Sequence, residues 1–66
     1  MNSLSKLLKE KKVSRLDLHF LAGTSFITIY GIEKHNYKPR AEICERIAKV
    51  LGVNVEDIWP KETERS

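Results

Sequence analysis

The spacing of apolar residues along the chain predicts a series of short helices. Leu4, Leu7 and Leu8 follow the i, i+3, i+4 spacing of one helical face. A longer helix is predicted over residues 40–51, where apolar side chains recur at i, i+4, i+7 and i+8 as Ile43, Ile47, Val50 and Leu51. A helical period on both sides of the middle of the chain indicates an all-α fold.

Small polar residues and glycines mark where further helices begin and end. Ser14 is expected to cap a second helix, with Asp17 at the third position of a capping box, and Gly23 to end that helix. Ser25 is expected to cap a third helix and Asn54 a short last one. The chain is therefore expected to hold five helices, with a short turn between the second and the third.

The second predicted helix carries more apolar residues than one buried face needs. We expect Leu18, Leu21 and Ala22 to form its inward stripe. Leu16 and Phe20 form a separate apolar pair at i and i+4, which allows two interpretations. We favour an outlying part of the core, and the alternative is a surface that binds a partner protein.

The segment after Ser25 gives conflicting signals. Residues 26–30 are β-branched or aromatic, which is typical of a strand. The chain offers no partner strand, and a lone strand leaves its backbone groups unpaired, so we predict a helix. Ile29 and Ile32 then face inward, and the outer side carries Phe26, Ile27, Tyr30 and Gly31. Residues 35–39 are predicted as a loop, with His35 in the left-handed conformation.

The length and the composition indicate one small domain. The chain has 66 residues, which we divide into a folded domain over residues 1–60 and a polar tail over residues 61–66. Cys44 is the one cysteine, so an internal disulfide is excluded, and His19 and His35 lack ligand spacing with it. We expect Cys44 to be a small core residue, and we expect no metal, no cofactor and no enzymatic activity.

The location and the charge can also be read from the sequence. Nothing resembles a signal peptide, and no apolar run approaches the ~20 residues of a membrane span, so we expect a cytoplasmic protein with no membrane contact. Residues 1–40 carry 8 basic and 3 acidic side chains, a net charge of +5, whereas residues 41–66 carry 4 and 6, a net charge of −2. This asymmetry favours a partner that is a polyanion.

Several short motifs share one frame in the first two thirds of the chain. They are Val13-Ser14-Arg15, Leu18-His19, Gly23-Thr24-Ser25, Thr28-Ile29, Ile32-Glu33-Lys34-His35 and Pro39. Their joint spacing resembles the phage repressor and Cro-like (XRE-type) family of helix-turn-helix regulators. The stretch IAKVLGVNVEDIW at residues 47–59 resembles the family's last two helices. The resemblance covers about residues 4–59 and implies a lambda-repressor-like domain of five helices.

The resemblance implies a regulator that binds double-stranded DNA with its third helix in the major groove. Base contacts are then expected from Arg15, Phe26, Ile27, Tyr30 and Gly31. Contacts with the DNA backbone are expected from Ser14, Ser25, Lys34, Asn36, Tyr37, Lys38 and Arg40. A pseudo-palindromic operator would be bound by a homodimer, with dimer contacts from Val55, Ile58 and Trp59.

Some positions depart from the family pattern. Arg15 replaces the usual glutamine, His19 the usual alanine and His35 the usual glycine. The expected base-reading positions of the third helix hold Phe26, Ile27, Tyr30 and Gly31 instead of polar residues. We therefore expect methyl contacts and DNA shape to carry much of the specificity.

Two functions are compatible with this sequence. The first is a sequence-specific regulator, in particular a repressor that blocks polymerase at an overlapping promoter. The alternative is a protein-interaction module of the same fold, of the antitoxin or anti-repressor type, which docks a protein on the face of Phe26, Ile27 and Tyr30. The basic loop around Lys38 favours the first, because a protein-binding face has no need of it.

Overall fold

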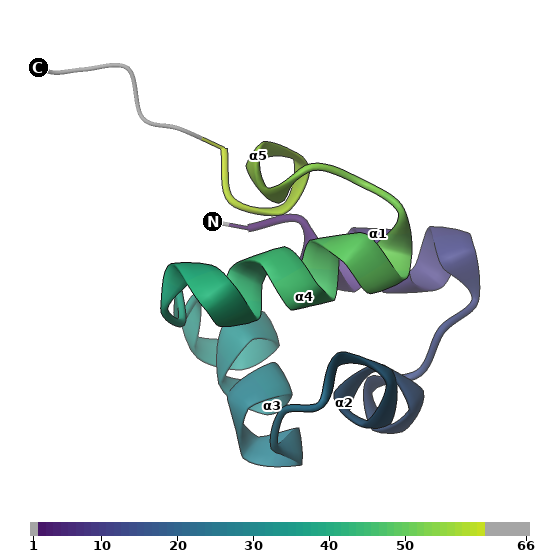
Figure 1. Cartoon of the computed structure of the whole chain (residues 1–66). Coiled ribbons are helices and arrows are strands. Elements are labelled where there is room, and N and C mark those ends of the chain that lie inside the picture. Colours follow the sequence, from purple (N-terminus) through teal and green to yellow (C-terminus); the bar gives the residue numbers. More distant parts are fainter. Residues whose placement is uncertain (1, 61–66) are drawn as a thin grey trace, which may run out of the picture.

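The structure is a computed structural model, and it describes residues 2–60. Within those residues the chain forms five helices: α1 (Leu4–Lys11), α2 (Arg15–Ala22), α3 (Phe26–His35), α4 (Ala41–Leu51) and α5 (Val55–Ile58). α4 runs across the molecule, with α2 and α3 on one side and α5 on the other (Figure 1). The predicted all-α fold is confirmed. The polar tail predicted over residues 61–66 lies outside the described residues.

One apolar core joins all five helices. A side chain from each helix is fully buried, with an exposed fraction of 0% at Leu4, Leu18, Ile29, Ile32, Ile47 and Ile58. Cys44 belongs to this core as predicted, and its thiol donates a hydrogen bond to the Pro39 carbonyl at 3.1 Å. Burial raises the pKa of the Cys44 thiol, so the side chain stays protonated near neutral pH and behaves as a small apolar residue.

The predicted caps position the helices. The Ser14 hydroxyl accepts a hydrogen bond from the Asp17 backbone N–H at 3.0 Å, and the Ser25 hydroxyl accepts one from Thr28 at 3.1 Å. Gly23 ends α2 in the left-handed conformation, with a φ of 69°. These local contacts fix the two ends of the turn between α2 and α3.

The conflicting segment after Ser25 is helical, as predicted. Ile29 and Ile32 have no exposed surface, and they attach α3 to the core. Burial of these two side chains outweighs the strand propensity of residues 26–30, because helix propensities differ by less than about 1 kcal/mol per residue. The end of α3 differs from the prediction: His35 is its last helical residue, and Asn36 takes the left-handed conformation, with a φ of 54°.

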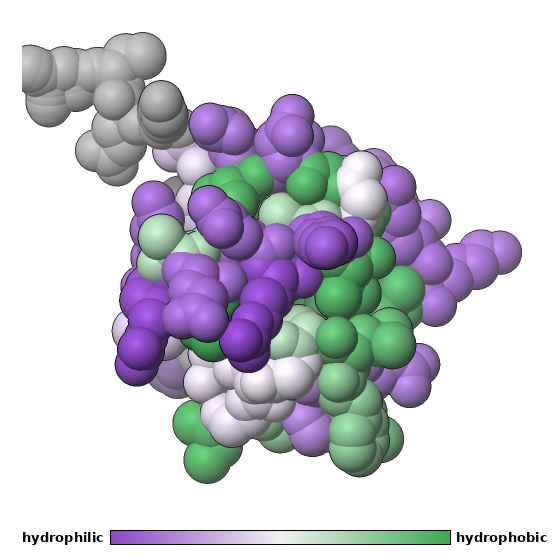
Figure 2. All heavy atoms as spheres, viewed as in Figure 1, coloured by the Kyte–Doolittle hydropathy of each residue, from purple (hydrophilic) through white to green (hydrophobic). Residues whose placement is uncertain are grey.

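The structure contradicts the prediction that the apolar residues of α2 are mostly buried. Leu16, Phe20 and Leu21 are 54%, 72% and 64% exposed, so neither the outlying core at Leu16 and Phe20 nor the inward position of Leu21 is correct. α2 packs through Leu18 and Ala22 against α3 and α4, while α1 packs against α3 and α4 and leaves the flank of α2 uncovered. Figure 2 shows apolar side chains gathered on the surface over α2.

The predicted dimer residues have a different environment from the one expected. Ile58 is fully buried and Trp59 is 7% exposed, both within a single chain. The Ser3 backbone N–H donates to the Ile58 carbonyl at 2.8 Å and ties the start of the chain to α5. Because these side chains complete the core of the monomer, only Val55 of the three retains surface for a second copy.

Candidate nucleic-acid interface

The helix-turn-helix unit presents one outer face of α3. Across its turn, the Thr24 backbone N–H donates to the His19 carbonyl at 3.1 Å, and the hydroxyls of Ser25 and Thr28 are 2.8 Å apart. The His19 ring occupies the junction between α2 and α3, where Nδ1 lies 3.1 Å from the Thr24 carbonyl and the ring centroid lies 5.9 Å from that of Phe26. The imidazole therefore fills the junction between the two helices.

Three of the predicted base-reading residues lie on this outer face. Ile27 is 80% exposed, and Phe26 and Tyr30 are 40% and 41% exposed. None of these side chains is needed to complete the core, which Ile29 and Ile32 supply from the opposite side of α3. The exposed residues form an apolar surface, which we call the α3 face and define as Phe26, Ile27 and Tyr30.

Arg15 reaches the α3 face from the first turn of α2. Its guanidinium carbon lies 5.5 Å from the centroid of the Tyr30 ring, within the range of a cation–π contact. Its Nε lies 2.7 Å from Oε2 of Glu33, and the side chains of Arg15 and Glu33 are 33% and 8% exposed. Arg15, which was predicted to contact bases, is thus held between α2 and α3 and does not extend freely into solvent.

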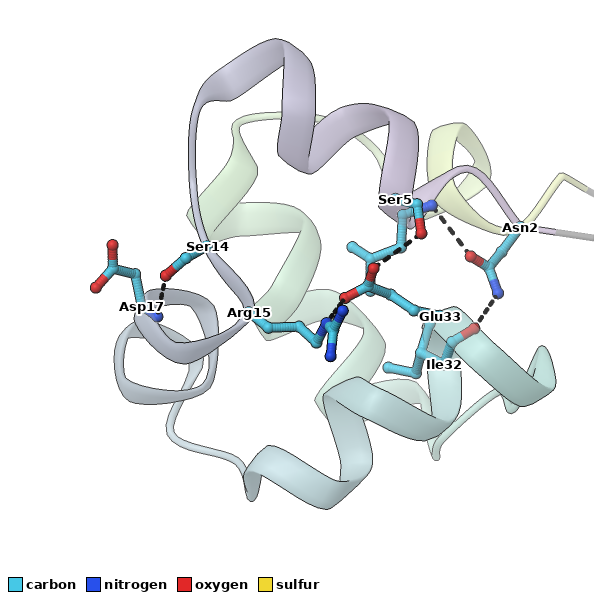
Figure 3. A network of polar contacts seen from close by, with 8 residues as sticks. Asn2, Ser5, Ser14, Arg15, Asp17, Ile32 and Glu33 are labelled. Atoms are coloured by element: carbon cyan, nitrogen blue, oxygen red, sulfur yellow. Dashed lines mark hydrogen bonds and ion pairs between the residues drawn. The ribbon is translucent and has the colours of Figure 1, made fainter.

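Glu33 is a residue whose role was not predicted from the sequence. Its Oε1 accepts a hydrogen bond from the Ser5 hydroxyl at 2.9 Å, while its Oε2 forms the ion pair with Arg15. The Nε–H of Arg15 is not aimed at Oε2, so this close contact is electrostatic and not a well-aligned hydrogen bond. Figure 3 shows the carboxylate of Glu33 between Ser5 of α1 and Arg15 of α2. One carboxylate therefore links three helices beside the α3 face.

Gly31 stands inside α3 without a packing reason. A Cβ atom built at this position would lie 3.7 Å from Cβ of Tyr37, which is an ordinary van der Waals contact. A glycine in a helix costs about 0.5–1 kcal/mol relative to alanine. Since the fold has room for a methyl group, the absence of a side chain fits a close approach of a ligand to the backbone of α3.

Five of the seven residues predicted to contact the DNA backbone line two hollows. Ser25, Tyr37 and Arg40 line one open hollow of about 310 Å³ beside the start of α3. Ser14 and Lys34 line a second hollow of about 540 Å³, together with Arg15. Lys38 is exposed in the loop after α3, as is Asn36, whose Oδ1 accepts a hydrogen bond from Nδ2 of Asn2 at 2.9 Å.

Two further cations of the second hollow were not predicted as site residues. Lys9 and Lys12 line it from the end of α1. Lysines near the C-terminus of a helix are favoured by the helix dipole. Because the dipole alone explains their presence, nothing in the sequence indicated that they belong to a site. Lys12 is close to the start of α2 because the connection between the two helices is short, and the packing of α1 beside α3 adds Lys34 to the same hollow.

The residues that the structure describes offer neither a metal site nor a membrane span. Residues 2–60 contain no group of three or more His, Cys, Asp and Glu side chains that could hold a metal ion. Among the helices of this part of the chain, none is long and apolar enough to cross a membrane.

Comparisons with known proteins agree with the geometry. The sequence model of a family described as helix-turn-helix matches residues 4–58, which is most of the chain. An uncharacterised HTH-type transcriptional regulator of the archaeon Methanocaldococcus jannaschii is 44% identical over 43 residues. That match covers 65% of this chain and 65% of the relative, so it spans slightly less than two thirds of the relative's length.

Proposed function

We propose a sequence-specific, operator-binding function for this chain, which belongs to the helix-turn-helix family of DNA-binding transcriptional regulators. The regulator acts as a repressor, by covering a promoter that overlaps its operator. The observation that carries this proposal is the α3 face, an apolar and solvent-exposed surface on the second helix of the helix-turn-helix unit, flanked by basic side chains.

The α3 face reads the major groove through apolar contacts. The major groove is about 12 Å wide and admits an α-helix, and thymine presents a C5-methyl group there. The exposed side chains of Phe26 and Ile27 supply apolar atoms for such methyl groups, and the Tyr30 hydroxyl can donate to a base edge or a phosphate. The missing side chain of Gly31 lets the α3 backbone approach the bases, and Arg15 adds a cation beside Tyr30.

Phosphate contacts on both sides of the α3 face set the register. Ser25, Tyr37 and Arg40 converge on one hollow, and Lys38 lies in the adjoining loop. Ser14 and Lys34 lie with Arg15 at the other hollow. Contacts of this kind position a protein on DNA without reading its sequence. We therefore propose that these residues strengthen binding and fix the orientation of the protein on the duplex.

We further propose that two copies bind a pseudo-palindromic operator with half-sites about 34 Å apart. A domain of this size gains stability and affinity from a second copy. Ile58 and Trp59 are engaged in the core, which leaves the partly exposed Val55 as the candidate contact from α5. α5 lies on the side of α4 away from α2 and α3, so a contact there leaves the α3 face open to DNA (Figure 1).

A second candidate function rests on the exposed apolar residues of α2. Leu16, Phe20 and Leu21 give α2 an apolar surface that the fold does not use. A protein-interaction module would dock its partner there or on the α3 face. The exposed cations around the α3 face favour DNA as the main partner, because they would stay unused in an apolar protein interface.

Two single substitutions test the separate roles that we propose for the phosphate contacts and for the α3 face. Lys38→Ala is expected to weaken binding to all duplexes alike and to make the slope of log K against log salt shallower by about 1. Phe26→Ala is expected to change which bases are preferred, because it removes an apolar contact with the groove. Both variants are measured on duplexes recovered from a random pool. An equal loss of affinity for every sequence with Phe26→Ala would contradict base reading by the α3 face.

A further inference from the structure

The side of α2 that the fold leaves uncovered continues into a hollow beside α4. Leu16, Phe20 and Leu21 are exposed on this side, and we call them the α2 face. The hollow has a volume of about 440 Å³. The end of α2 lines it with Phe20 and Leu21, and α4 lines it with Arg46, Lys49 and Val50. An apolar surface of this kind, with room for a side chain from outside, is typical of a contact with another protein.

Charges of opposite sign border the two ends of the α2 face. Asp17 lies in the first turn of α2, one turn before Phe20 and Leu21, and its carboxylate points away from the fold (Figure 3). Arg46 and Lys49 lie at the other end, beside the hollow. Within residues 2–60, Asp17 and Lys49 form no ion pair. A complementary partner therefore brings a cation to the first turn of α2 and a carboxylate to the hollow.

A second copy of the chain meets both requirements at once. If two α2 helices pack antiparallel about a two-fold axis, the first turn of each lies against the last turn of the other. Leu16 of one copy then reaches the hollow of the other, and Asp17 comes close to Lys49. The two-fold axis repeats these contacts, because an isologous interface uses the same surface on both copies. A partner with charge of one sign would match only one end of the face.

We propose that a second copy of this chain docks on the α2 face, with the two α2 helices antiparallel. The inference goes beyond the proposed function, and the contact is separate from the one proposed at Val55 of α5. The hollow lies between α2 and α4, whereas Arg15 contacts Glu33 and Tyr30 of α3. The α3 face therefore stays open to DNA when two copies meet at α2.

Sedimentation equilibrium of the full chain, without DNA, tests this contact. Chain concentrations up to about 1 mM are used, because an interface of one short helix is small and its association weak. Phe20→Ser is expected to raise the dissociation constant of one association step about tenfold, since it removes the largest apolar side chain of the face. The midpoint of thermal unfolding is expected to stay unchanged, because Phe20 lies outside the core. The same masses for the parent chain and Phe20→Ser at every concentration would overturn the inference.

An exchange of charges tests whether the occupant is a second copy. Asp17→Lys and Lys49→Asp are each expected to raise the dissociation constant about fivefold, because the symmetric contact loses two ion pairs. The double variant is expected to recover most of this loss, since the pairs form again with reversed charges.

Lys11→Asp is the matched control for the change of charge. Lys11 lies in the last turn of α1, as Lys49 does in α4, and it does not line the hollow. Its substitution is expected to leave the dissociation constant within error of the parent value. A double variant that associates more weakly than both single variants would overturn the inference, and so would equal losses in Lys11→Asp and Lys49→Asp.

The result is distinct from that for the proposed function, because association is measured without DNA. Selection of duplexes from a random pool tests DNA reading separately, and Phe20→Ser is expected to keep the half-site of the parent chain. A chain that selects a half-site but shows no loss of association in Phe20→Ser refutes the α2 contact alone. A chain that associates through α2 but selects no sequence refutes the proposed function and leaves the α2 contact in place.

Discussion

Glu33 shows how a single side chain can couple the fold to the α3 face. Its carboxylate is almost inaccessible to water, and it holds Arg15 from α2 and Ser5 from α1. Removal of one charge from an ion pair that is largely buried is unfavourable, because the other charge is left without compensation. The orientation of Arg15, and with it the cation beside Tyr30, is therefore a consequence of Glu33.

Glu33→Gln is expected to lower the free energy of unfolding by about 1–3 kcal/mol, the range for a buried polar group left without its partner, because Arg15 keeps some contact with water. Glutamine retains an oxygen for the Ser5 hydroxyl, so the loss reports mainly on the contact with Arg15. Glu42→Gln is the matched control, because Glu42 pairs with Arg46 at 3.1 Å but is 63% exposed. That change is expected to cost less than about 0.5 kcal/mol. Equal losses in urea denaturation would show that burial does not decide the strength of the Arg15 pair.

At the same scale, the sequence predicts local contacts better than distant ones. The caps at Ser14 and Ser25 were predictable because donor and acceptor lie three residues apart. The Arg15–Glu33 pair was not, since it depends on how α2 packs against α3. The left-handed residue after α3 was placed one position early, at His35 instead of Asn36, because both residue types tolerate that conformation.

At the scale of the element, α3 combines a stable inner side with an unfavourable outer one. Ile29 and Ile32 supply the burial, whereas the outer side carries β-branched and aromatic residues and a glycine, all poor helix formers. The helix was nevertheless predictable, because a strand had no partner in the chain. The outer residues are not needed for the fold, which is consistent with a role in binding.

Gly31→Ala tests that role. The added methyl group meets Tyr37 at an ordinary distance, so the substitution is expected to stabilise the fold by up to about 1 kcal/mol. It is expected to weaken binding to a selected duplex, because the methyl group keeps the α3 backbone away from the bases. Thermal unfolding and titration of the same duplex give the two values. A more stable variant with unchanged affinity would show that the backbone of α3 does not approach DNA closely.

The exposed apolar residues of α2 could not be predicted from the sequence. Periodicity identifies an apolar residue but does not show which neighbouring helix covers it. Leu18 and Ala22 are covered by α3 and α4, and the flank with Leu16 and Phe20 is not, because α1 packs elsewhere. The same limit applies to α5, where Ile58 was expected in a dimer contact and instead completes the core.

At the scale of the whole molecule, basic residues gather around the α3 face. One hollow contains Arg40, and the other contains Lys9, Lys12 and Lys34. The charge count over residues 1–40 predicted a basic half, but not that cations of α1 and of α3 line one hollow. This arrangement is typical of a protein that tracks the DNA backbone on both sides of a groove.

Sequence-specific reading by the α3 face is tested by selecting duplexes from a random pool at about 150 mM salt, where non-specific attraction to phosphates is reduced. We expect recovery of an inverted repeat with half-sites about one helical turn apart and thymines at defined positions in each half. Recovery of no common sequence, with binding that disappears as the salt concentration rises, would contradict sequence-specific reading by the α3 face.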